Sequence, residues 1–244
     1  MSEVLDRYFD LIDSQNNPSI RRKLSFRLNR CFGNIDFKNK SMLDIGGGAG
    51  FYSFYAASMG AKKVVCLEPE SAGSTRGMVD SFQTFKKSLN ADGVIHLEVK
   101  TLQEFSQGNE KFDIIFLHNS INHLDEEACI NLKTDKNSRE IYSSLFKKIS
   151  DLCNSGSKII ISDCSNYNIF PLLRMKNPFS PTIEWHKHQS PVLWADMLSK
   201  FDFQNPEITW NSFNRLGSIG RFFLGNKYAS FFLGSHFNLF MDKK

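Results

Sequence analysis

The chain has 244 residues, of which 41% are hydrophobic and 23% charged, and its formal net charge is +4. This length suits one sizeable α/β domain and is somewhat short for two independent cores, so we expect a single domain over residues 1–244. The composition lacks the strong basic excess that nucleic-acid binding by bulk electrostatics usually brings. Nucleic acid is therefore not the expected partner, but charge alone names no other.

Sequence features also indicate where the protein is located. The first residues, MSEVLDRYFDLID, indicate an amphipathic helix rather than a signal peptide, and no segment approaches the ~18 apolar residues of a membrane span. The five cysteines are scattered, without a disulfide framework or the paired spacing of a zinc site. We expect a cytoplasmic protein without a membrane span. The sequence does not specify its oligomeric state.

Residues 1–40 predict two helices that form an N-terminal helical cap. Asn17-Pro18 supplies a capping residue and a first-turn proline for the second helix, which is expected to stop near Gly33. The outer face of this second helix is cationic, which suits a solvated face or a surface that meets an anionic substrate. Its cations are Arg21, Arg22, Lys23, Arg27 and Arg30.

From residue 41 onward, apolar runs typical of strands alternate with helical patterns, which predicts an α/β fold with a mostly parallel sheet covered on both faces. Two late segments alternate polar and apolar residues and complete a seven-stranded sheet. We expect the core at 41–164 and the substrate-side insertions and last strands at 165–244. The insertions are an irregular one at Asn166–Gln189 and a helical one at 212–234. The expected strands are Met42–Ile45, Lys63–Leu67, Val94–Leu97, Asp113–Leu117, Lys158–Ser162, Glu207–Asn211 and His236–Met241.

A glycine-rich turn follows the first of these strands. The sequence runs D-x-G-x-G-x-G from Asp44 to Gly50, whereas dinucleotide-binding loops follow G-x-G-x-x-G. Glycine lets the backbone approach a ligand closely because it has no Cβ. A carboxylate at Asp44 would repel a pyrophosphate but could hold an ammonium group. A tight turn without a ligand and a nicotinamide dinucleotide site are the alternatives.

This segment resembles the cofactor loop of class I S-adenosylmethionine-dependent methyltransferases, whose fold is Rossmann-like. The resemblance covers residues 41–165 well and 184–244 more loosely. It implies that Asp44 holds the amino group of the cofactor and that Glu68 binds its ribose hydroxyls. The acid that many members carry after the third strand is absent, which leaves the adenine to backbone groups at Thr101 and Leu102. The resemblance assigns the methionine portion to Gly46, Gly47, Gly48 and Gly50.

After the fourth strand comes FLHNSINHLDEEAC, residues 116–129, which lacks the D/N-P-P-Y/F motif of DNA amino-methyltransferases. The run from His123 to Cys129 is instead similar to the H-D-W-S-D-E-x-C run of small-molecule O-methyltransferases, whose histidine is the general base. That implies a base role for His123; capping the next helix or lining the cofactor site is the alternative. His118 is expected to form a wall of the cofactor pocket, and Asn119 to contact the substrate.

Two later segments carry further candidates. The stretch IEWHKHQSPVLW at 183–194 resembles an E-W-x-x-H-Q-x-P stretch of bacterial methyltransferase-domain proteins, and its His186 and His188 are expected to contact substrate or to be structural. No carboxylate is positioned to complete a metal site with them, so we expect none. Asn166 and Tyr167 follow the fifth strand; Asn166 is a substrate-contact candidate and Tyr167 a second base candidate.

Together these features predict an S-adenosylmethionine-dependent methyltransferase (EC 2.1.1.-) that acts on a hydroxyl of a small metabolite or sugar-type acceptor and releases S-adenosylhomocysteine. The cationic helix, with Arg174, Arg215 and Arg221, mildly favours an anionic acceptor. An N-methyltransferase of a small amine and an RNA methyltransferase remain alternatives. A non-catalytic partner protein that keeps the cofactor site for stability is an alternative of a different class.

Overall fold

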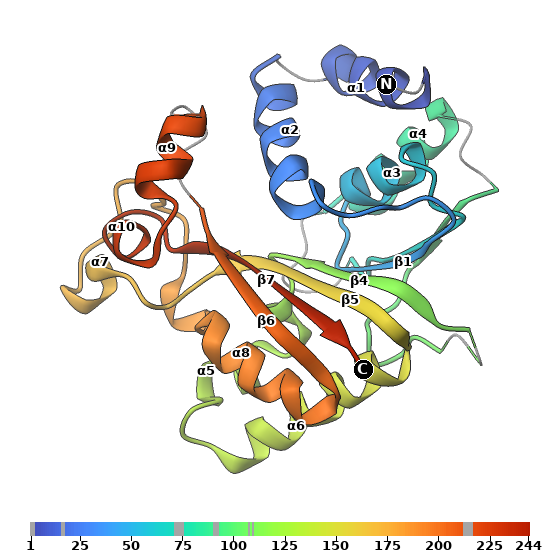
Figure 1. The fold of residues 1–244 in the computed structure, drawn as a ribbon. Coiled ribbons are helices and arrows are strands. Elements are labelled where there is room, and N and C mark those ends of the chain that lie inside the picture. Colours follow the sequence, from blue (N-terminus) through green and yellow to red (C-terminus); the bar gives the residue numbers. More distant parts are fainter. Residues whose placement is uncertain are drawn as a thin grey trace. The chain divides into compact units, whose positions relative to one another are not determined.

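The chain folds around one hydrogen-bonded sheet of seven strands in the order β3-β2-β1-β4-β5-β7-β6 (Figure 1). A computed structural model describes residues 3–15, 18–70, 76–89, 93–106, 108, 110–211 and 217–244. β1 pairs in parallel with β2 and β4, and β2 with β3, whereas β7 runs antiparallel to β5 and β6. The seven-stranded α/β prediction is confirmed, with a mixed sheet. The strands are β1 (Ser41–Ile45), β2 (Lys63–Leu67), β3 (Ile95–Glu98), β4 (Phe112–His118), β5 (Cys153–Cys164), β6 (Phe203–Trp210) and β7 (His236–Lys243).

The largest boundary difference concerns β5. The predicted strand starts at Lys158, but β5 begins at Cys153, directly after the helix that ends at Asp151. It therefore includes Asn154, Ser155 and Gly156, which are residues typical of a turn. The reason is hydrogen bonding to the start of β4: the Phe112 N–H donates to the Leu152 carbonyl at 2.8 Å, and the Ser157 hydroxyl donates to the Phe112 carbonyl at 2.6 Å. Local turn residues are overridden here by pairing with a distant segment.

The chain divides into two compact units, and the first comprises Met1–His118 with Leu152–Ser157. Its helices are α1 (Glu3–Gln15), α2 (Pro18–Phe32), α3 (Phe51–Ser58) and α4 (Met78–Leu89). Helix α3 packs on β1 and β2. Phe32 of α2, Tyr52 of α3 and Phe116 of β4 form an aromatic cluster, with ring centroids 4.7 to 5.9 Å apart. This cluster attaches the second N-terminal helix to the sheet.

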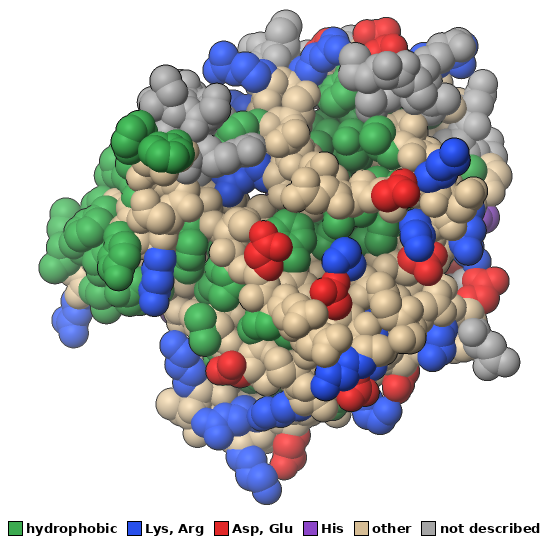
Figure 2. Space-filling view, in the orientation of Figure 1, with side chains coloured by type: hydrophobic (Ala, Val, Ile, Leu, Met, Phe, Trp, Pro, Cys, Tyr) green, Lys and Arg blue, Asp and Glu red, His purple; other side chains and the backbone are tan. Residues whose placement is uncertain are grey.

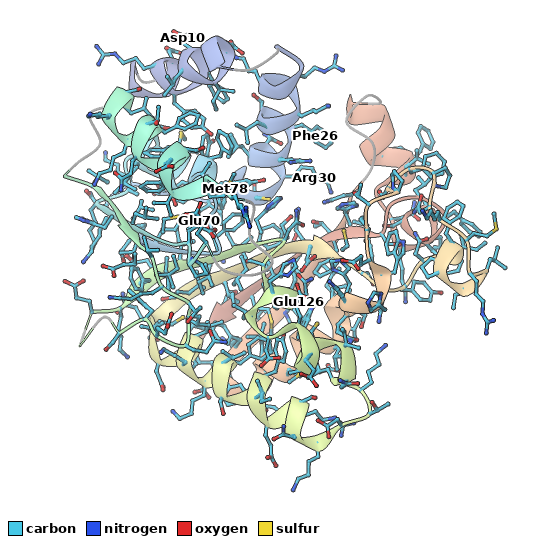
Figure 3. The ribbon with its side chains drawn as sticks, turned by 180° about the vertical axis from the view of Figure 1, so that it is seen from behind. Asp10, Phe26, Arg30, Glu70, Met78 and Glu126 are labelled. Atoms are coloured by element: carbon cyan, nitrogen blue, oxygen red, sulfur yellow. The ribbon has the colours of Figure 1, made fainter. Side chains whose placement is uncertain are left out.

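The two predicted N-terminal helices are confirmed. Helix α2 begins at Pro18, whose fixed φ suits a first helical turn, and ends where the Gly33 N–H donates to the Asn29 carbonyl at 2.9 Å. The predicted cap, Asn17, lies outside the described residues. On the cationic face, the Arg30 guanidinium lies 5.4 Å from the centre of the Phe26 ring (Figure 3).

The second unit comprises Asn119–Asp151 and Lys158–Lys244. Its core contains Trp194, which is fully buried and lies 5.2 Å from the Tyr142 ring and 5.9 Å from the Phe146 ring. The helical insertion predicted between the last two strands is confirmed in its described part, where α9 and α10 lie. The helices of this unit are α5 (Glu126–Asn131), α6 (Lys136–Asp151), α7 (Ile169–Leu172), α8 (Pro191–Leu198), α9 (Gly217–Leu224) and α10 (Lys227–Phe232).

Within the described part of the chain, no helix is both long enough and apolar enough to cross a bilayer.

Candidate functional site

The glycine turn after β1 is held against the end of β2. The Gly46 and Gly47 N–H groups both donate to the Leu67 carbonyl, at 2.8 and 3.1 Å. Gly46 and Gly48 have φ of 72° and 57°, the left-handed region that glycine adopts without strain. A Cβ on Gly47 would lie 2.4 Å from the Cys66 sulfur and 2.8 Å from the Asp44 carboxyl carbon. The turn therefore needs glycine at these three positions for its own geometry.

Gly50 has a different role. It precedes α3 with φ of 80°, and a Cβ there would lie 2.5 Å from the Phe82 ring of α4. Among the described residues, it is not one of those that line the cavity beside the turn. The close packing of α3 against α4 therefore explains why glycine is needed at position 50. The predicted contact of Gly50 with a cofactor stays a prediction.

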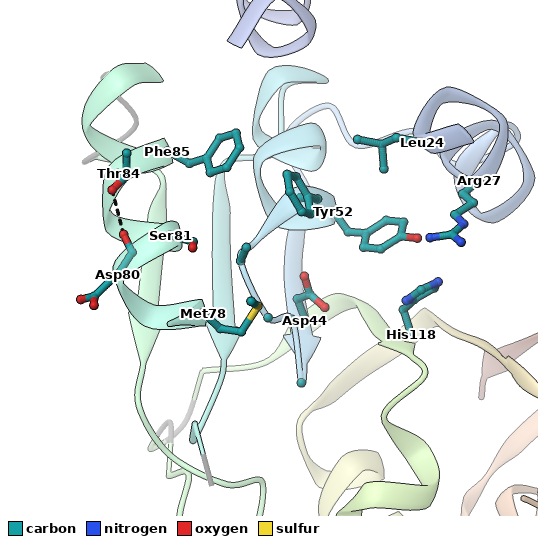
Figure 4. Close-up of a pocket in the computed structure, with 15 residues that line it drawn as sticks. Leu24, Arg27, Asp44, Tyr52, Met78, Asp80, Ser81, Thr84, Phe85 and His118 are labelled. Atoms are coloured by element: carbon teal, nitrogen blue, oxygen red, sulfur yellow. Dashed lines mark hydrogen bonds between the residues drawn. The ribbon is translucent and has the colours of Figure 1, made fainter. Parts of the chain in front are cut away.

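A cavity of about 870 Å³ opens beside the glycine turn (Figure 4). Its walls come from α2, the turn, α3, α4 and the end of β4, all within the first unit. A cavity of this size accommodates a nucleoside-sized ligand. The lining residues are Leu24, Arg27, Asp44, Gly46, Gly47, Gly48, Ala49, Phe51, Tyr52, Met78, Asp80, Ser81, Thr84, Phe85 and His118.

Asp44 places a buried carboxylate in the wall of this cavity. Its side chain is 1% exposed, and one carboxylate oxygen, Oδ2, accepts a hydrogen bond from the Ser53 hydroxyl at 2.7 Å. The other, Oδ1, is buried without a hydrogen-bond partner among the described residues. Burial raises the Asp44 pKa to about 7; the Ser53 hydrogen bond lowers it and the charge of Glu68 raises it further. A buried acceptor without a partner destabilises a protein unless a ligand supplies a donor.

A positively charged group, the Arg27 guanidinium, and a neutral hydrogen-bond donor, the Tyr52 hydroxyl, lie on the same side of the cavity. The Tyr52 hydroxyl points toward the Arg27 guanidinium, with the His118 ring beside them (Figure 4). The His118 and Tyr52 ring centroids are 4.7 Å apart. Burial holds the Tyr52 pKa well above its usual value, although the Arg27 charge acts to lower it. Tyr52 is therefore a neutral phenol, able to donate a hydrogen bond.

Sequence reasoning did not single out Tyr52 or the α4 residues of the cavity. Tyr52 is the second residue after the glycine turn, at a position where an aromatic residue is equally typical of helix packing. Arg27 was named only as part of a cationic helix face. The signal that could have separated it from its neighbours is Leu24, a buried residue one helical turn earlier on the same side of α2.

Glu68 lies at the end of β2 and is 4% exposed. Its carboxylate accepts hydrogen bonds from the Gly48 N–H at 2.9 Å and from the Glu70 N–H at 3.0 Å. Thr101 is hydrogen-bonded to the Glu104 side chain, and Leu102 is 2% exposed. Among the described residues, none of these three lines the cavity. Their assignments to ribose and adenine remain predictions.

His123 lies in the second unit, in a short 3-10 helix at Ile121–Leu124. Its Nδ1 atom is 2.5 Å from Glu126 Oε1, and Glu126 Oε2 is 3.1 Å from the Lys187 ammonium nitrogen. Figure 3 marks Glu126 at the start of α5. Burial acts to raise the Glu126 pKa, but hydrogen bonds from Lys187 and His123 hold it below its usual value. The cap of α5 is Asp125, which accepts from the Ala128 N–H at 2.9 Å, so His123 is not the capping residue.

The remaining predicted residues also belong to the second unit. Asn119 has φ of 51°, and its N–H donates to the Ser162 carbonyl at 2.8 Å. Asn166 donates to the Gln189 side chain at 3.3 Å. The Tyr167 ring lies 4.6 Å from that of Phe231.

The two histidines of the E-W-x-x-H-Q-x-P-like stretch have different surroundings. His188 Nδ1 lies 3.2 Å from the Oδ1 atom of buried Asp163, which favours a structural role, whereas His186 is exposed. Within the described ranges, no group of three or more His, Cys, Asp or Glu side chains is placed to hold a metal ion.

Comparison with known proteins adds three findings. A family model described as a methyltransferase domain matches residues 36–204. Protein arginine N-methyltransferase 1 of Caenorhabditis elegans is 34% identical over 79 residues, which are 32% of this chain and only 22% of that protein. A methyltransferase of Aquifex aeolicus dependent on S-adenosylmethionine superposes with a TM-score of 0.59 at 12% identity, covering 97% of this chain and 98% of its own.

A further solved structure carries a bound product. Phosphoethanolamine N-methyltransferase 2 of Haemonchus contortus, in complex with phosphomonomethylethanolamine and S-adenosylhomocysteine, superposes with a TM-score of 0.57 at 15% identity. The superposition covers 91% of this chain and 52% of that one. At these identities the two superpositions establish the fold.

Proposed function

This chain belongs to the methyltransferase domain family and is an S-adenosylmethionine-dependent methyltransferase, and from that premise we propose that it methylates a hydroxyl group of a small metabolite or sugar-type acceptor. The location belongs to the same proposal: five buried cysteines outside any disulfide suit the reducing cytoplasm. The observations that support the proposal concern the cofactor first and the acceptor second.

The cavity of the first unit fits the amino-acid end of the cofactor. The unpartnered Oδ1 atom of Asp44 would accept a hydrogen bond from the cofactor's ammonium group, which supplies the missing donor. The left-handed turn at Gly46 and Gly48 leaves the backbone open to close approach by a ligand. A dinucleotide fits worse, because its pyrophosphate would meet a buried acid. An orphaned carboxylate oxygen is thus the single observation that supports the cofactor site most strongly.

Arg27 and Tyr52 complete this end of the site. The Arg27 guanidinium and the neutral Tyr52 phenol can both donate hydrogen bonds to a carboxylate. Both groups lie on the α2 side of the cavity, whereas Met78 and Ser81 of α4 lie on the other side (Figure 4). We assign the carboxylate of the cofactor to them. Arg27 lies before residue 36, where the family match begins, so this assignment comes from the geometry of the chain itself.

Glu68 is assigned to the ribose hydroxyls, and the backbone at Thr101 and Leu102 to the adenine. The Glu68 carboxylate accepts from two backbone N–H groups, which fixes its position. A carboxylate can accept several hydrogen bonds at once, which suits a pair of ribose hydroxyls.

The acceptor side of the proposal depends on the His123–Glu126 pair. When bound, the cofactor supplies an electrophilic methyl group on its sulfonium. A hydroxyl becomes a competent nucleophile as it loses its proton, and His123 can take that proton on Nε2 while Nδ1 remains bonded to Glu126. An amine that is already neutral has no such need. The paired histidine is therefore the observation that favours oxygen over nitrogen.

Four further residues of the second unit are assigned to the acceptor, and Tyr167 is assigned as a second base. The four are Asn119, Asn166, His186 and His188. The contact of His188 with Asp163 makes it the weakest of these assignments. An anionic acceptor agrees with the cationic face of α2 and with the phosphorylated ligand in the Haemonchus contortus structure.

The decisive experiment compares His123→Ala with His96→Ala, a matched control that removes an exposed histidine of β3. Purified protein is incubated with S-adenosylmethionine and a panel of hydroxyl compounds, and S-adenosylhomocysteine release is measured. With any hydroxyl acceptor that turns over, His123→Ala should reduce kcat by roughly a hundredfold or more. Its affinity for S-adenosylhomocysteine should not change. Full turnover by His123→Ala would exclude the base role.

A small amine is the second candidate acceptor, because several proteins that this chain resembles are N-methyltransferases. The same panel extended to primary and secondary amines separates the two. Turnover restricted to amines, and unaffected by His123→Ala, would replace the hydroxyl proposal while leaving the cofactor site intact.

A further inference from the structure

The second unit displays an unusual concentration of exposed apolar side chains on α7, α9, α10 and the turn after α7. The described part of the chain has 13 exposed large hydrophobic residues, and nine of them lie within 167–179 and 222–232. We refer to these nine as the aromatic surface. Its members are Tyr167, Leu172, Leu173, Met175, Phe179, Phe222, Phe223, Tyr228 and Phe232.

Three of these side chains are more than two-thirds exposed. Phe222 is 82% exposed, Tyr228 81% and Leu172 69%. Figure 2 shows hydrophobic side chains gathered over α7, α9 and α10, with Lys and Arg side chains beside them. Apolar patches of this kind on a protein surface mark an interaction site.

Hydrogen bonds from buried side chains connect the segments that carry the aromatic surface. Asn168 and Asn177, both buried, donate to the Leu233 carbonyl at 3.0 and 2.5 Å, and the buried Ser235 hydroxyl donates to the Tyr167 carbonyl at 2.7 Å. These bonds fasten the turn around α7 to the end of α10. The exposed rings are therefore held out by a buried polar network that joins segments more than 50 residues apart.

The electrostatics of the same segments are one-sided. Residues 165–183 and 208–241 contain no Asp or Glu, and their cations are Arg174, Lys176, Arg215, Arg221 and Lys227. The Lys227 ammonium lies 5.3 Å from the centre of the Tyr167 ring, so charge and aromatic groups are interleaved. Aromatic and leucine side chains between cations are typical of structures that lie in the interface of an anionic bilayer.

We propose that the aromatic surface binds the surface of an anionic lipid bilayer, with its rings in the headgroup region and its cations against lipid phosphates. A second copy of this chain fits less well, because a two-fold contact would bring Arg174, Lys176 and Lys227 of one copy against the same cations of the other. The binding is peripheral, in agreement with helices that are too short or too polar to span a membrane in the described part of the chain.

The test is co-sedimentation of the purified chain with vesicles. Vesicles of equal parts phosphatidylglycerol and phosphatidylcholine should retain the protein, and vesicles of phosphatidylcholine alone should retain much less. Added salt should release it, because screening weakens attraction between surface charges. Absence of binding to the anionic vesicles would overturn the proposal, as would equal binding to both kinds.

Variants separate the apolar and charged contributions. The double variant Phe222→Ser/Phe223→Ser should lower the partition coefficient by about tenfold or more for each ring removed. Arg174→Gln/Lys176→Gln should lower it about fivefold for each charge. The matched controls, Ile130→Ser/Val192→Ser and Lys136→Gln/Lys200→Gln, change exposed residues elsewhere on the second unit and should bind vesicles like the unmodified chain.

All variants should keep their affinity for S-adenosylhomocysteine, which shows that they are folded, since none changes the cofactor cavity. Equal losses in the control and surface variants would overturn the proposal. A different result would also overturn the proposal: the chain does not bind vesicles, and sedimentation equilibrium shows self-association that Phe222→Ser/Phe223→Ser abolishes. That outcome would identify a second copy as the occupant.

Discussion

Replacement of Asp44 by asparagine tests the cofactor site and its energetic cost in one variant. Asparagine keeps the shape of the side chain, and its carbonyl oxygen can still accept from the Ser53 hydroxyl. It removes the negative charge that we assign to the cofactor's ammonium group. We expect the variant to bind S-adenosylmethionine much more weakly and yet to be more stable without ligand at alkaline pH.

The magnitude follows from the pKa of Asp44, which is about 7 in the folded protein because the side chain is buried. An unfolded aspartate has a pKa of about 3.9. The folded state thus holds a proton that the unfolded state has lost between these two values, and unliganded stability falls as pH rises across that window. At 1.36 kcal/mol per pH unit, the full loss is about 4 kcal/mol, which is an upper limit.

The assay is urea unfolding of the unliganded protein at about pH 4 and about pH 8. The free energy of unfolding of Asp44→Asn should nearly equal that of the original chain at about pH 4. At about pH 8 the variant should be more stable than the original chain by about a few kcal/mol. Asp196→Asn, at an exposed position on α8, is the matched control and should show no such growth. A difference for Asp44→Asn that does not increase with pH would refute the reasoning.

Two further predictions concern the same cavity. Arg27→Leu should weaken binding of S-adenosylhomocysteine by about tenfold or more, because a charge-assisted hydrogen bond is lost. Calorimetry should show unchanged binding of 5′-methylthioadenosine, which has no carboxylate. Equal losses for both ligands would contradict the carboxylate assignment. Gly48→Val should abolish cofactor binding, because φ of 57° is strained for a β-branched residue and the added side chain extends into the cavity; calorimetry showing normal affinity would refute the assignment of the turn.

Sequence patterns predicted the sheet and the glycine turn well because both depend on local signals. Buried parallel strands such as β2 consist of apolar runs bounded by polar residues, and Lys63–Leu67 was placed without error. The predicted start of β5 was wrong because the first residues of this strand resemble the end of a helix. They include Gly156, whose φ is 79°. Only their pairing with Phe112, some 40 residues away in sequence, makes them a strand.

The cavity wall could be predicted only in part, for a similar reason. Asp44 and His118 flank strands whose positions are readable from apolar runs, and both line the cavity. Arg27 reaches it because the Phe32 ring of α2 packs against Tyr52 and Phe116, contacts between segments that no local pattern reports. The cationic face of α2 therefore contained both solvated side chains and one that belongs to the site.

The glycines themselves do not distinguish a ligand site from a structural turn. Gly47 is required because a Cβ would collide with Cys66 and Asp44, and Gly50 because it would collide with Phe82, so both would be needed in a turn that bound nothing. A turn without a ligand, however, has no reason to bury a carboxylate whose pKa is near 7 and leave one of its oxygens without a hydrogen bond. That destabilising arrangement becomes favourable only when a cation occupies the cavity, which is why Asp44, more than the glycine motif, identifies the site.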